Sequence, residues 1–567
     1  MRISSVHPYW KARYDLTNSA SPLRCSPVAY VLHQLLTESA TRRPDAEAVR
    51  LLDQALTYAE LEKLSNQLAH ALIEIGVVPG DRIGIYLHKS PAAIASIFGV
   101  MKTGACYVPV DPNAPGLRLA EIARQCGFRA LITSSLLYEK LSGAFSNECS
   151  MAAIFFIDKS PDTALPAPAV TFADSLPSQP VASPAVNVID QDLAYILFTS
   201  GSTGSPKGVM LSHLNALTFV SWACDTFAIC GTDRLSSHAP FNFDLSVFDI
   251  FAAIKAGAAI SLVPEGLSSF PVQLSSFIQD QGITVWYSVP MVLMMLTRGK
   301  LHGRDLSRLR LVLFAGEVFP IKHLRNLRRM LPEARMANLY GPTETNVCTW
   351  YEVGQIPEDQ TTPIPIGQAC ANMAVIAIDE AGRRVVAPGQ EGLLYVRGSN
   401  VMQGYYDRPS ESATCFINNP FAPGRHEKVY CTGDWVTIDE QGNFLLIGRK
   451  DHMIKTRGYR VELGEIEAVM VAHRAVNEAV ALAIPDEAIG NTIHAIVTVS
   501  DSNSLTSTEL KRHCAEKLPS YMVPEEIEFC QMLPRTGTGK IDRQRLLSQR
   551  IRLAPQNDGK EARLPAL

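Results

Sequence analysis

The stretch FTSGSTGSPKG, residues 198–208, decides the fold of this chain. It follows a β-like run at residues 193–198 and precedes a short apolar run at 209–211 and a helix capped by Ser212. Glycines let the backbone approach a ligand and point its N–H groups inward. The hydroxyls add hydrogen-bond donors, and the lysine adds positive charge. We therefore expect a mobile loop that wraps a polyphosphate.

Two other kinds of loop have a similar composition, a Walker A loop and a Gly/Ser-rich surface turn. A Walker A loop needs Gly-x-x-x-x-Gly-Lys-Ser/Thr, but here Pro206 stands before the lysine and Gly208 after it. A Gly/Ser-rich surface turn would look similar in composition. The string as a whole resembles the phosphate loop of the adenylate-forming enzymes (acyl-CoA synthetases, luciferases and peptide-synthetase adenylation domains). The resemblance implies ATP contacts from Thr199, Ser200, Gly201, Ser202, Thr203, Gly204 and Lys207.

Size and composition set the outer bounds. The 567 residues allow roughly three or four domains of about 150 residues. A net charge of −4 offers no general attraction to nucleic acid or to an anionic membrane. The twelve cysteines contain no Cys-x-x-Cys pair, so neither a zinc site nor a disulfide framework is indicated. The N-terminus lacks a signal-peptide core, and the most apolar helix candidate, residues 92–101, is too short to span a bilayer. We expect a cytoplasmic protein that binds neither nucleic acid nor membrane.

The segment before the loop predicts a parallel sheet. Thr57 and Glu60 form a capping box at the start of a helix, and residues 82–87 read as a strand. A helix then begins at Ser90-Pro91, and residues 105–110 read as the next strand. Strand, helix and strand at this spacing form a βαβ unit, which implies a parallel sheet covered by helices. Residues 137–190 are weakly patterned and rich in Ser, Pro and Ala, so we expect surface connections there.

Further signatures of the same family follow in order, and the resemblance covers about residues 30–545. The run from Tyr340 to Glu344 resembles the nucleotide motif, in which the tyrosine packs on adenine and the glutamate holds Mg²⁺. Asp434 matches the ribose-binding aspartate and Arg449 the second ribose contact. Lys540, on a Gly/Thr loop, matches the catalytic lysine that bridges the substrate carboxylate and the α-phosphate. The resemblance implies catalytic roles for Lys540, Thr343, Glu344 and His238, and further ATP contacts from Gly316, Glu317, Asn338, Tyr340, Gly341, Thr343, Asp434, Arg449 and Lys540.

The same resemblance divides the chain. The expected fold is α/β, with a large N-terminal adenylation part of βαβ-type sheets covered by helices and a small, mobile α+β C-terminal domain. The boundaries are an irregular extension at 1–25, the large part at 26–450, the small domain at 451–550 with its hinge at Asp451, and a tail at 551–567. The string at 455–467 resembles the loop that faces the site during thioester formation. No Gly-Gly-x-Ser carrier motif follows residue 545, so a stand-alone ligase is expected.

The spacing of these motifs also places the specificity pocket of the family on this sequence. One carboxylate, Asp244, suits the ammonium of an amino acid, and Lys540 at the other end suits its carboxylate. The rest of the lining is lipophilic, which favours a compact aliphatic amino acid. Tyr287 is the least secure member, because its run could slip by one residue. The predicted lining is Asp244, Leu245, Phe248, Tyr287, Leu313, Ala315, Leu339, Val347 and Cys348.

Three functions compete at this point. The lining resembles that of free-standing ligases that load L-proline onto a holo peptidyl carrier protein with ATP and Mg²⁺. Another small aliphatic amino acid could replace proline in the same chemistry. An acyl-CoA synthetase would not need Asp244, and a non-catalytic nucleotide-binding relative would not need Lys540, Glu344 and Asp434. The sequence favours the first function.

Overall fold

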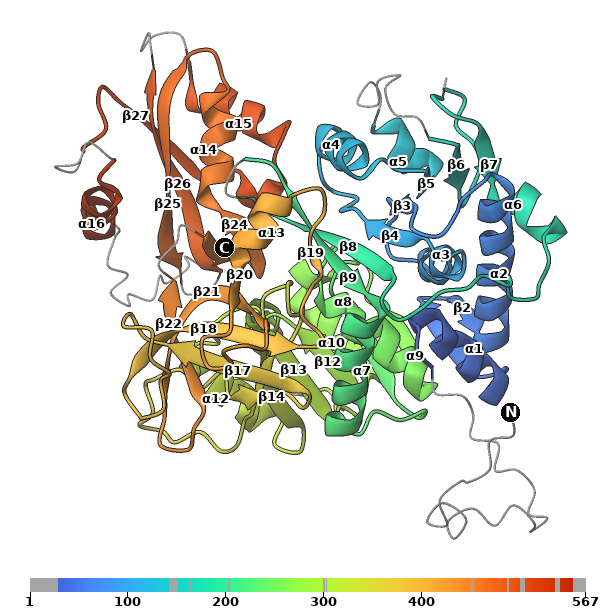
Figure 1. Ribbon diagram of the computed structural model, residues 1–567, viewed down its shortest axis with the longest axis horizontal. Helices are drawn as coiled ribbons and strands as arrows, with labels where there is room; N and C mark the ends of the chain where they lie inside the picture. Colours follow the sequence, from blue (N-terminus) through green and yellow to red (C-terminus); the bar gives the residue numbers. More distant parts are fainter. Residues whose placement is uncertain are drawn as a thin grey trace, which may run out of the picture.

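The structure is a computed structural model, and its elements are drawn in Figure 1. It describes residues 29–141, 151–163, 165–201, 204–298, 301, 303–449, 453–486, 489–499, 505–535 and 541–553. The N-terminal extension predicted at 1–25 and the hinge residue Asp451 lie outside these ranges. None of the described helices is both long enough and apolar enough to cross a bilayer.

The first large sheet carries the loop that opens the sequence analysis. Its eight strands run in the order β19 (Gly404–Tyr405), β9 (Lys207–Ser212), β8 (Leu193–Thr199), β4 (Cys106–Pro109), β3 (Arg82–Ile85), β5 (Ala130–Thr133), β6 (Ala153–Phe156) and β7 (Ala169–Thr171). Strands β3 and β4 are parallel neighbours, as the βαβ pattern predicted. The prediction of surface connections at 137–190 is wrong at β6, which is fully buried and pairs in parallel with β5.

The second large sheet has nine strands and a mostly parallel centre. Their order is β16 (Gln368–Ala369), β15 (Thr349–Glu352), β14 (Arg335–Tyr340), β13 (Leu311–Ala315), β12 (Val285–Ser288), β10 (Arg234–Ser237), β11 (Ala259–Leu262), β1 (Glu47–Leu51) and β2 (Gln54–Thr57). A third, five-stranded sheet is built from β17 (Met373–Ile378), β18 (Glu391–Gly398), β21 (Lys428–Ile438), β20 (Phe416–Asn418) and β22 (Phe444–Arg449).

Helices join and cover the two large sheets. The helix α3 (Pro91–Lys102) is apolar almost all round and contacts strands of both sheets, as a helix buried between layers should. It begins at the Ser90 cap, and α2 (Tyr58–Glu74) begins at the Thr57 capping box, as predicted. Other helices of this part are α1 (Leu32–Arg42), α4 (Gly116–Cys126), α5 (Ser135–Glu139), α6 (Phe172–Ser175), α7 (His213–Phe227), α8 (Leu245–Val247), α9 (Ala253–Ala256), α10 (Pro271–Asp280), α11 (Pro290–Arg298), α12 (Ile321–Met330) and α13 (Pro409–Cys415).

The remainder of the chain forms a smaller unit. A hairpin, β23 (Met453–Thr456) and β24 (Tyr459–Glu462), leads into α14 (Leu463–Val471) and a three-stranded sheet of β25 (Val476–Asp486), β26 (Gly490–Val499) and β27 (Glu526–Cys530). Figure 1 shows α14 and α15 (Ser507–Ala515) on one side of this sheet and α16 (Arg543–Leu553) on the other. Two separate apolar clusters, one on each face, agree with this arrangement. The helix α16 continues past residue 550, where a tail was expected.

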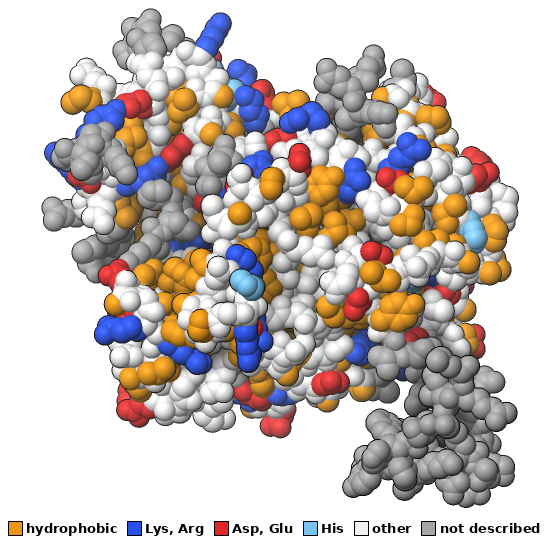
Figure 2. All heavy atoms as spheres, in the orientation of Figure 1, with side chains coloured by type: hydrophobic (Ala, Val, Ile, Leu, Met, Phe, Trp, Pro, Cys, Tyr) orange, Lys and Arg blue, Asp and Glu red, His pale blue; other side chains and the backbone are white. Residues whose placement is uncertain are grey.

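The surface shown in Figure 2 carries acidic and basic side chains interspersed with one another. This mixture agrees with the small net charge of the sequence. The cysteines among the described residues are free thiols.

Candidate active site

The predicted phosphate loop lies at the tip of a two-stranded hairpin. Strand β8 ends at Thr199 and β9 begins at Lys207, where the two residues pair directly. Gly204 has a φ of +86°, a backbone conformation that only glycine adopts without strain. Ser202 and Thr203 lie outside the described residues. The Lys207 ammonium is 3.0 Å from the Glu411 carboxylate and lies over the Tyr405 ring.

Three residues predicted for the nucleotide, Tyr340, Asp434 and Arg449, lie together on three different strands. The Tyr340 hydroxyl at the end of β14 donates to Asp434 Oδ2 over 2.5 Å. Arg449 on β22 donates to Asp434 Oδ1 over 3.1 Å, and β21 and β22 pair at these two residues. This arrangement can present a carboxylate to the two hydroxyls of a ribose. Asn338 instead donates its side-chain amide to the carbonyl of Pro365 over 2.9 Å.

The predicted magnesium ligand, Glu344, is completely buried. Arg460 of β24 donates to both of its carboxylate oxygens over 2.9 Å, and the Tyr405 hydroxyl donates to one of them over 2.6 Å. Burial alone would raise the pKa of Glu344, but the Arg460 charge and these hydrogen bonds lower it. The described residues contain no cluster of three or more His, Cys, Asp or Glu that could hold a metal by itself. One carboxylate together with phosphate oxygens is nevertheless a normal Mg²⁺ environment, so Glu344 fits the ion once Arg460 withdraws.

Asp244 supplies the carboxylate of the predicted amino-acid pocket. It precedes α8, is buried, and its pKa is raised to about 6 by burial, with a hydrogen bond to Thr343 and the charge of Lys455 acting against the rise. A cavity beside Asp244 extends from an apolar wall, formed by Leu245, Tyr287, Ala315 and Val347, to the ribose-binding pair Asp434 and Arg449. Of the residues predicted for the site, this cavity is lined by Asp244, Leu245, Tyr287, Ala315, Gly316, Gly341, Thr343, Val347, Asp434 and Arg449.

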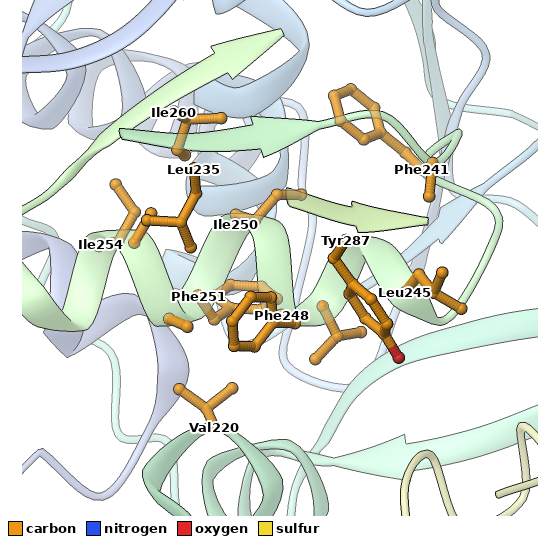
Figure 3. Close-up of a cluster of buried hydrophobic side chains, with 14 of the residues drawn as sticks. Val220, Leu235, Phe241, Leu245, Phe248, Ile250, Phe251, Ile254, Ile260 and Tyr287 are labelled. Carbon is orange, nitrogen blue, oxygen red and sulfur yellow. The ribbon is translucent and has the colours of Figure 1, made fainter. Parts of the chain in front are cut away.

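Part of this apolar wall comes from one face of the nine-stranded sheet. In the parallel register Tyr287 pairs with Leu313, and Ala315 pairs with Leu339, so these four residues face the same way. The neighbour of Tyr287 in sequence, Trp286, therefore faces away, and Tyr287 is the one of the two that lines the cavity. Figure 3 shows Tyr287 with Leu245 on one side and Phe248 on the other.

Some predicted members stand behind this wall. The Phe248 ring meets the Tyr287 ring edge-on at 5.5 Å and supports it. Leu313 and Leu339 lie on the same face of the sheet as Tyr287, but both are fully buried and neither lines the cavity. Cys348 packs with Tyr340 in a different apolar cluster, next to the third sheet. These four residues shape the pocket without lining the cavity itself.

His238, predicted to be catalytic, follows β10 and lies 5.4 Å from the Trp286 ring. Burial and the nearby Lys89 ammonium lower the pKa of His238 to about 3. The imidazole is therefore neutral at physiological pH and supplies no positive charge to the site.

The hairpin β23–β24 brings residues to the site that the sequence analysis did not assign. Lys455, Gly458 and Arg460 line the cavity together with Asp244. Gly458 donates its backbone N–H to the Glu317 carboxylate, another predicted site residue. Burial lowers the pKa of Lys455, although Asp434 and Asp244 act against this. Lys455, Gly458 and Arg460 belong to the string at 455–467, which we expected to face the site during thioester formation. Their place at the cavity depends on how the whole smaller unit docks.

The predicted catalytic lysine, Lys540, lies outside the described residues. The flanking residues Arg535 and Ile541 pair in an isolated bridge, and Leu533 and Leu546 pack on the face of β25–β26 opposite to α14. The face of the smaller unit that meets the site is therefore the one carrying β24 and α14.

Comparison with known proteins agrees with this geometry. The profile of the family described as AMP-binding enzyme matches residues 36–406, and that of the AMP-binding enzyme C-terminal domain matches residues 465–540. The chain belongs to the AMP-binding enzyme family.

Two relatives of this AMP-binding enzyme chain are similar over nearly their whole length. The L-proline–[L-prolyl-carrier protein] ligase of Pseudomonas fluorescens is 40% identical over 92% of this chain and 99% of its own. The enzyme of the same name from Streptomyces coelicolor is 38% identical over 87% of this chain and 91% of its own. The amide bond synthetase McbA from Marinactinospora thermotolerans has the same fold, with a TM-score of 0.79 at 23% identity over 92% of this chain and 99% of its own. The predicted fold, an α/β large part with a smaller C-terminal domain, is confirmed.

Proposed function

We propose that this enzyme activates L-proline with ATP as prolyl adenylate, releases pyrophosphate, and passes the prolyl group to the phosphopantetheine thiol of a separate carrier protein. The observation that carries the proposal is the buried Asp244 carboxylate, which lies in one cavity with the apolar side chains of Leu245, Tyr287, Ala315 and Val347, beside the ribose-binding pair. An isolated buried carboxylate is costly unless a cation pairs with it, and the ammonium of an amino acid is such a cation. The two relatives named as L-proline ligases support proline as that amino acid.

In the first half-reaction, a carboxylate oxygen of the amino acid attacks the α-phosphorus of ATP, and the bond to pyrophosphate breaks. Asp244 would hold the secondary ammonium, and Tyr287, Leu245 and Val347 would enclose the ring methylenes. Mg²⁺ arriving with ATP would lie on Glu344 and offset the phosphate charge. Lys540 would bridge the carboxylate and the α-phosphate as charge moves onto the leaving group.

In the second half-reaction, the carrier thiolate attacks the carbonyl carbon of the adenylate, and AMP leaves. The docked hairpin β23–β24 supports assigning the present arrangement to this step. Lys455 is then the cation beside Asp434 and can stabilise the phosphate of the departing AMP. We propose Asp451 as the hinge that exchanges this arrangement with the one that presents Lys540.

Pyrophosphate exchange with each of the amino acids tests the substrate. Proline should give the fastest exchange, azetidine-2-carboxylate and pipecolate weak exchange, and phenylalanine, lysine and glutamate none. One methylene in an apolar pocket changes the rate about 10–200-fold, so the ring homologues should be slowed to this extent. Faster exchange with another proteinogenic amino acid would exclude proline as the preferred substrate.

A labelled-transfer experiment separates the alternatives for the acceptor. Radiolabelled proline should appear on a holo-carrier and not as prolyl-CoA. If free CoA is the faster acceptor, the enzyme is an acyl-CoA synthetase. If no amino or carboxylic acid drives exchange, the chain is a non-catalytic nucleotide-binding relative.

A further inference from the structure

A buried ion pair joins the large part of the molecule to the smaller unit. Arg118 of α4 donates to Glu465 Oε1 of α14 over 2.6 Å, and the two side chains are 9% and 1% exposed. A buried charge needs a partner, so each of these residues holds the other in place while the two units are docked. When the units separate, both side chains enter water.

The second oxygen of Glu465 binds the phosphate loop itself. Glu465 Oε2 accepts a hydrogen bond from the backbone N–H of Gly201 over 3.1 Å, in a buried environment. Loop N–H groups that converge on one point form an anion site, and a carboxylate oxygen there takes the place of a phosphate oxygen.

Other contacts fit α14 and the end of β24 against the same loop. The Ser200 hydroxyl donates to the carbonyl of Arg460 over 2.9 Å and accepts from the N–H of Glu462 over 3.1 Å. At Gly204, an added Cβ would lie 2.8 Å from the Cβ of Ala468, so α14 touches the loop there with no space to spare. The donors of Ser200 and Gly201 are thus already used by the smaller unit.

We propose, resting on the function given above, that Glu465 is a positioning residue that binds the phosphate loop in place of the triphosphate. Binding of ATP to the loop and docking of α14 then exclude one another. The loop becomes available to Glu465 only after pyrophosphate has left, and the ion pair with Arg118 then favours the arrangement that loads the carrier. The order of the two half-reactions is set in this way by one carboxylate.

The same helix offers a matched control. Glu467 lies two residues after Glu465 in α14. It pairs with Arg543 over 2.6 Å and accepts a hydrogen bond from the N–H of Ala481 over 2.8 Å. All of these partners belong to the smaller unit. Glu467→Gln therefore removes one acidic charge from α14 without touching the loop or Arg118.

Binding of a non-reactive ATP analogue provides the test. Calorimetry would measure the affinity of wild type, Glu465→Gln and Glu467→Gln for the magnesium complex of α,β-methylene-ATP, and for adenosine, which has no phosphate. Because the apparent affinity is reduced by the fraction of molecules with an occupied loop, Glu465→Gln should bind the analogue at least about threefold more tightly. Adenosine affinity should stay unchanged, and Glu467→Gln should match wild type with both ligands.

A second readout examines the other half of the proposal. Transfer from preformed prolyl adenylate to the holo-carrier should slow about tenfold or more in Glu465→Gln and in Arg118→Met, since each leaves part of a buried ion pair unmatched. A general folding defect would weaken the affinity for the analogue and not strengthen it. Unchanged or weaker analogue binding in both variants would overturn the proposal. The binding readout does not depend on which amino acid is activated, so it remains valid even if proline is the wrong substrate.

Discussion

Gly458 offers the sharpest test of the docked arrangement. It lies in the β23–β24 turn with a φ of +83°, and an added Cβ would stand 2.6 Å from Val289 Cγ1 and 3.1 Å from Val289 Cβ. Val289 is buried and β-branched, so its side chain has little freedom to move away. Gly458→Ala should therefore oppose docking of the hairpin.

The substitution carries two energetic costs, backbone strain and a clash with Val289, and each affects a different measurement. The strain of an alanine at positive φ, about 1 kcal/mol, exists whether or not the hairpin is docked, so it lowers only the free energy of unfolding. The clash with Val289, about 1–3 kcal/mol for overpacking, exists only in the docked state. It should slow thioester formation about 5- to 150-fold and leave proline-dependent pyrophosphate exchange within about twofold of wild type.

The assay is single-turnover transfer of labelled prolyl adenylate to holo-carrier, beside pyrophosphate exchange on the same preparation. Val289→Ala should restore transfer to Gly458→Ala, because it removes the clashing Cγ1 atom but not the backbone strain. Gly442→Ala, at a φ of +79° with open space around it, is the control for strain alone. Equal loss of both half-reactions, or no rescue by Val289→Ala, would refute the docking argument.

The remaining predictions concern single side chains. Below pH 6 the Asp244 carboxylate, whose pKa is about 6, becomes protonated and loses its attraction for the ammonium, so kcat/KM for proline in pyrophosphate exchange should fall about tenfold per pH unit. Asp244→Asn should cripple exchange at every pH, and retention of full activity would contradict its role. Lys540→Ala should nearly abolish pyrophosphate exchange yet spare transfer from preformed adenylate; exchange at the wild-type rate would exclude this lysine. Arg460→Gln leaves Glu344 buried without its cation, at a cost of about 3–5 kcal/mol, so transfer should drop at least a hundredfold while exchange changes little. Asp451→Pro should slow transfer more than exchange, and equal slowing of both would argue against a hinge.

Local signals made much of the fold predictable. The capping box at Thr57 and the cap at Ser90 are short-range patterns, and the two helices begin where they indicate. Strand β6 was missed because four apolar residues inside a Ser- and Pro-rich segment show no alternation. A strand buried on both faces has no polar face to mark its period.

The site was predictable to the extent that it is built from one sheet. The spacing of motifs assigned Tyr287, Leu313 and Leu339 to one pocket, and the parallel register of β12, β13 and β14 brings them to one face of the sheet. Lys455 and Arg460 were not assigned because their distance from the pocket depends on how two folded units dock. No sequence pattern within either unit indicates how the two units dock.

Polar contacts hold part of the surface between the two units, among them Glu344 with Arg460, Glu317 with Gly458, and Ser200 with Glu462. Water can replace each of these partners when the units part, so the net free energy of each hydrogen bond is about 0.5–1.5 kcal/mol, or about 1.5–3 kcal/mol where one group is charged. An apolar contact of the same area would resist separation. After separation it would leave an exposed hydrophobic patch that favours aggregation. If the two units part and redock once per turnover, as proposed above, stronger adhesion in either state would lengthen every cycle.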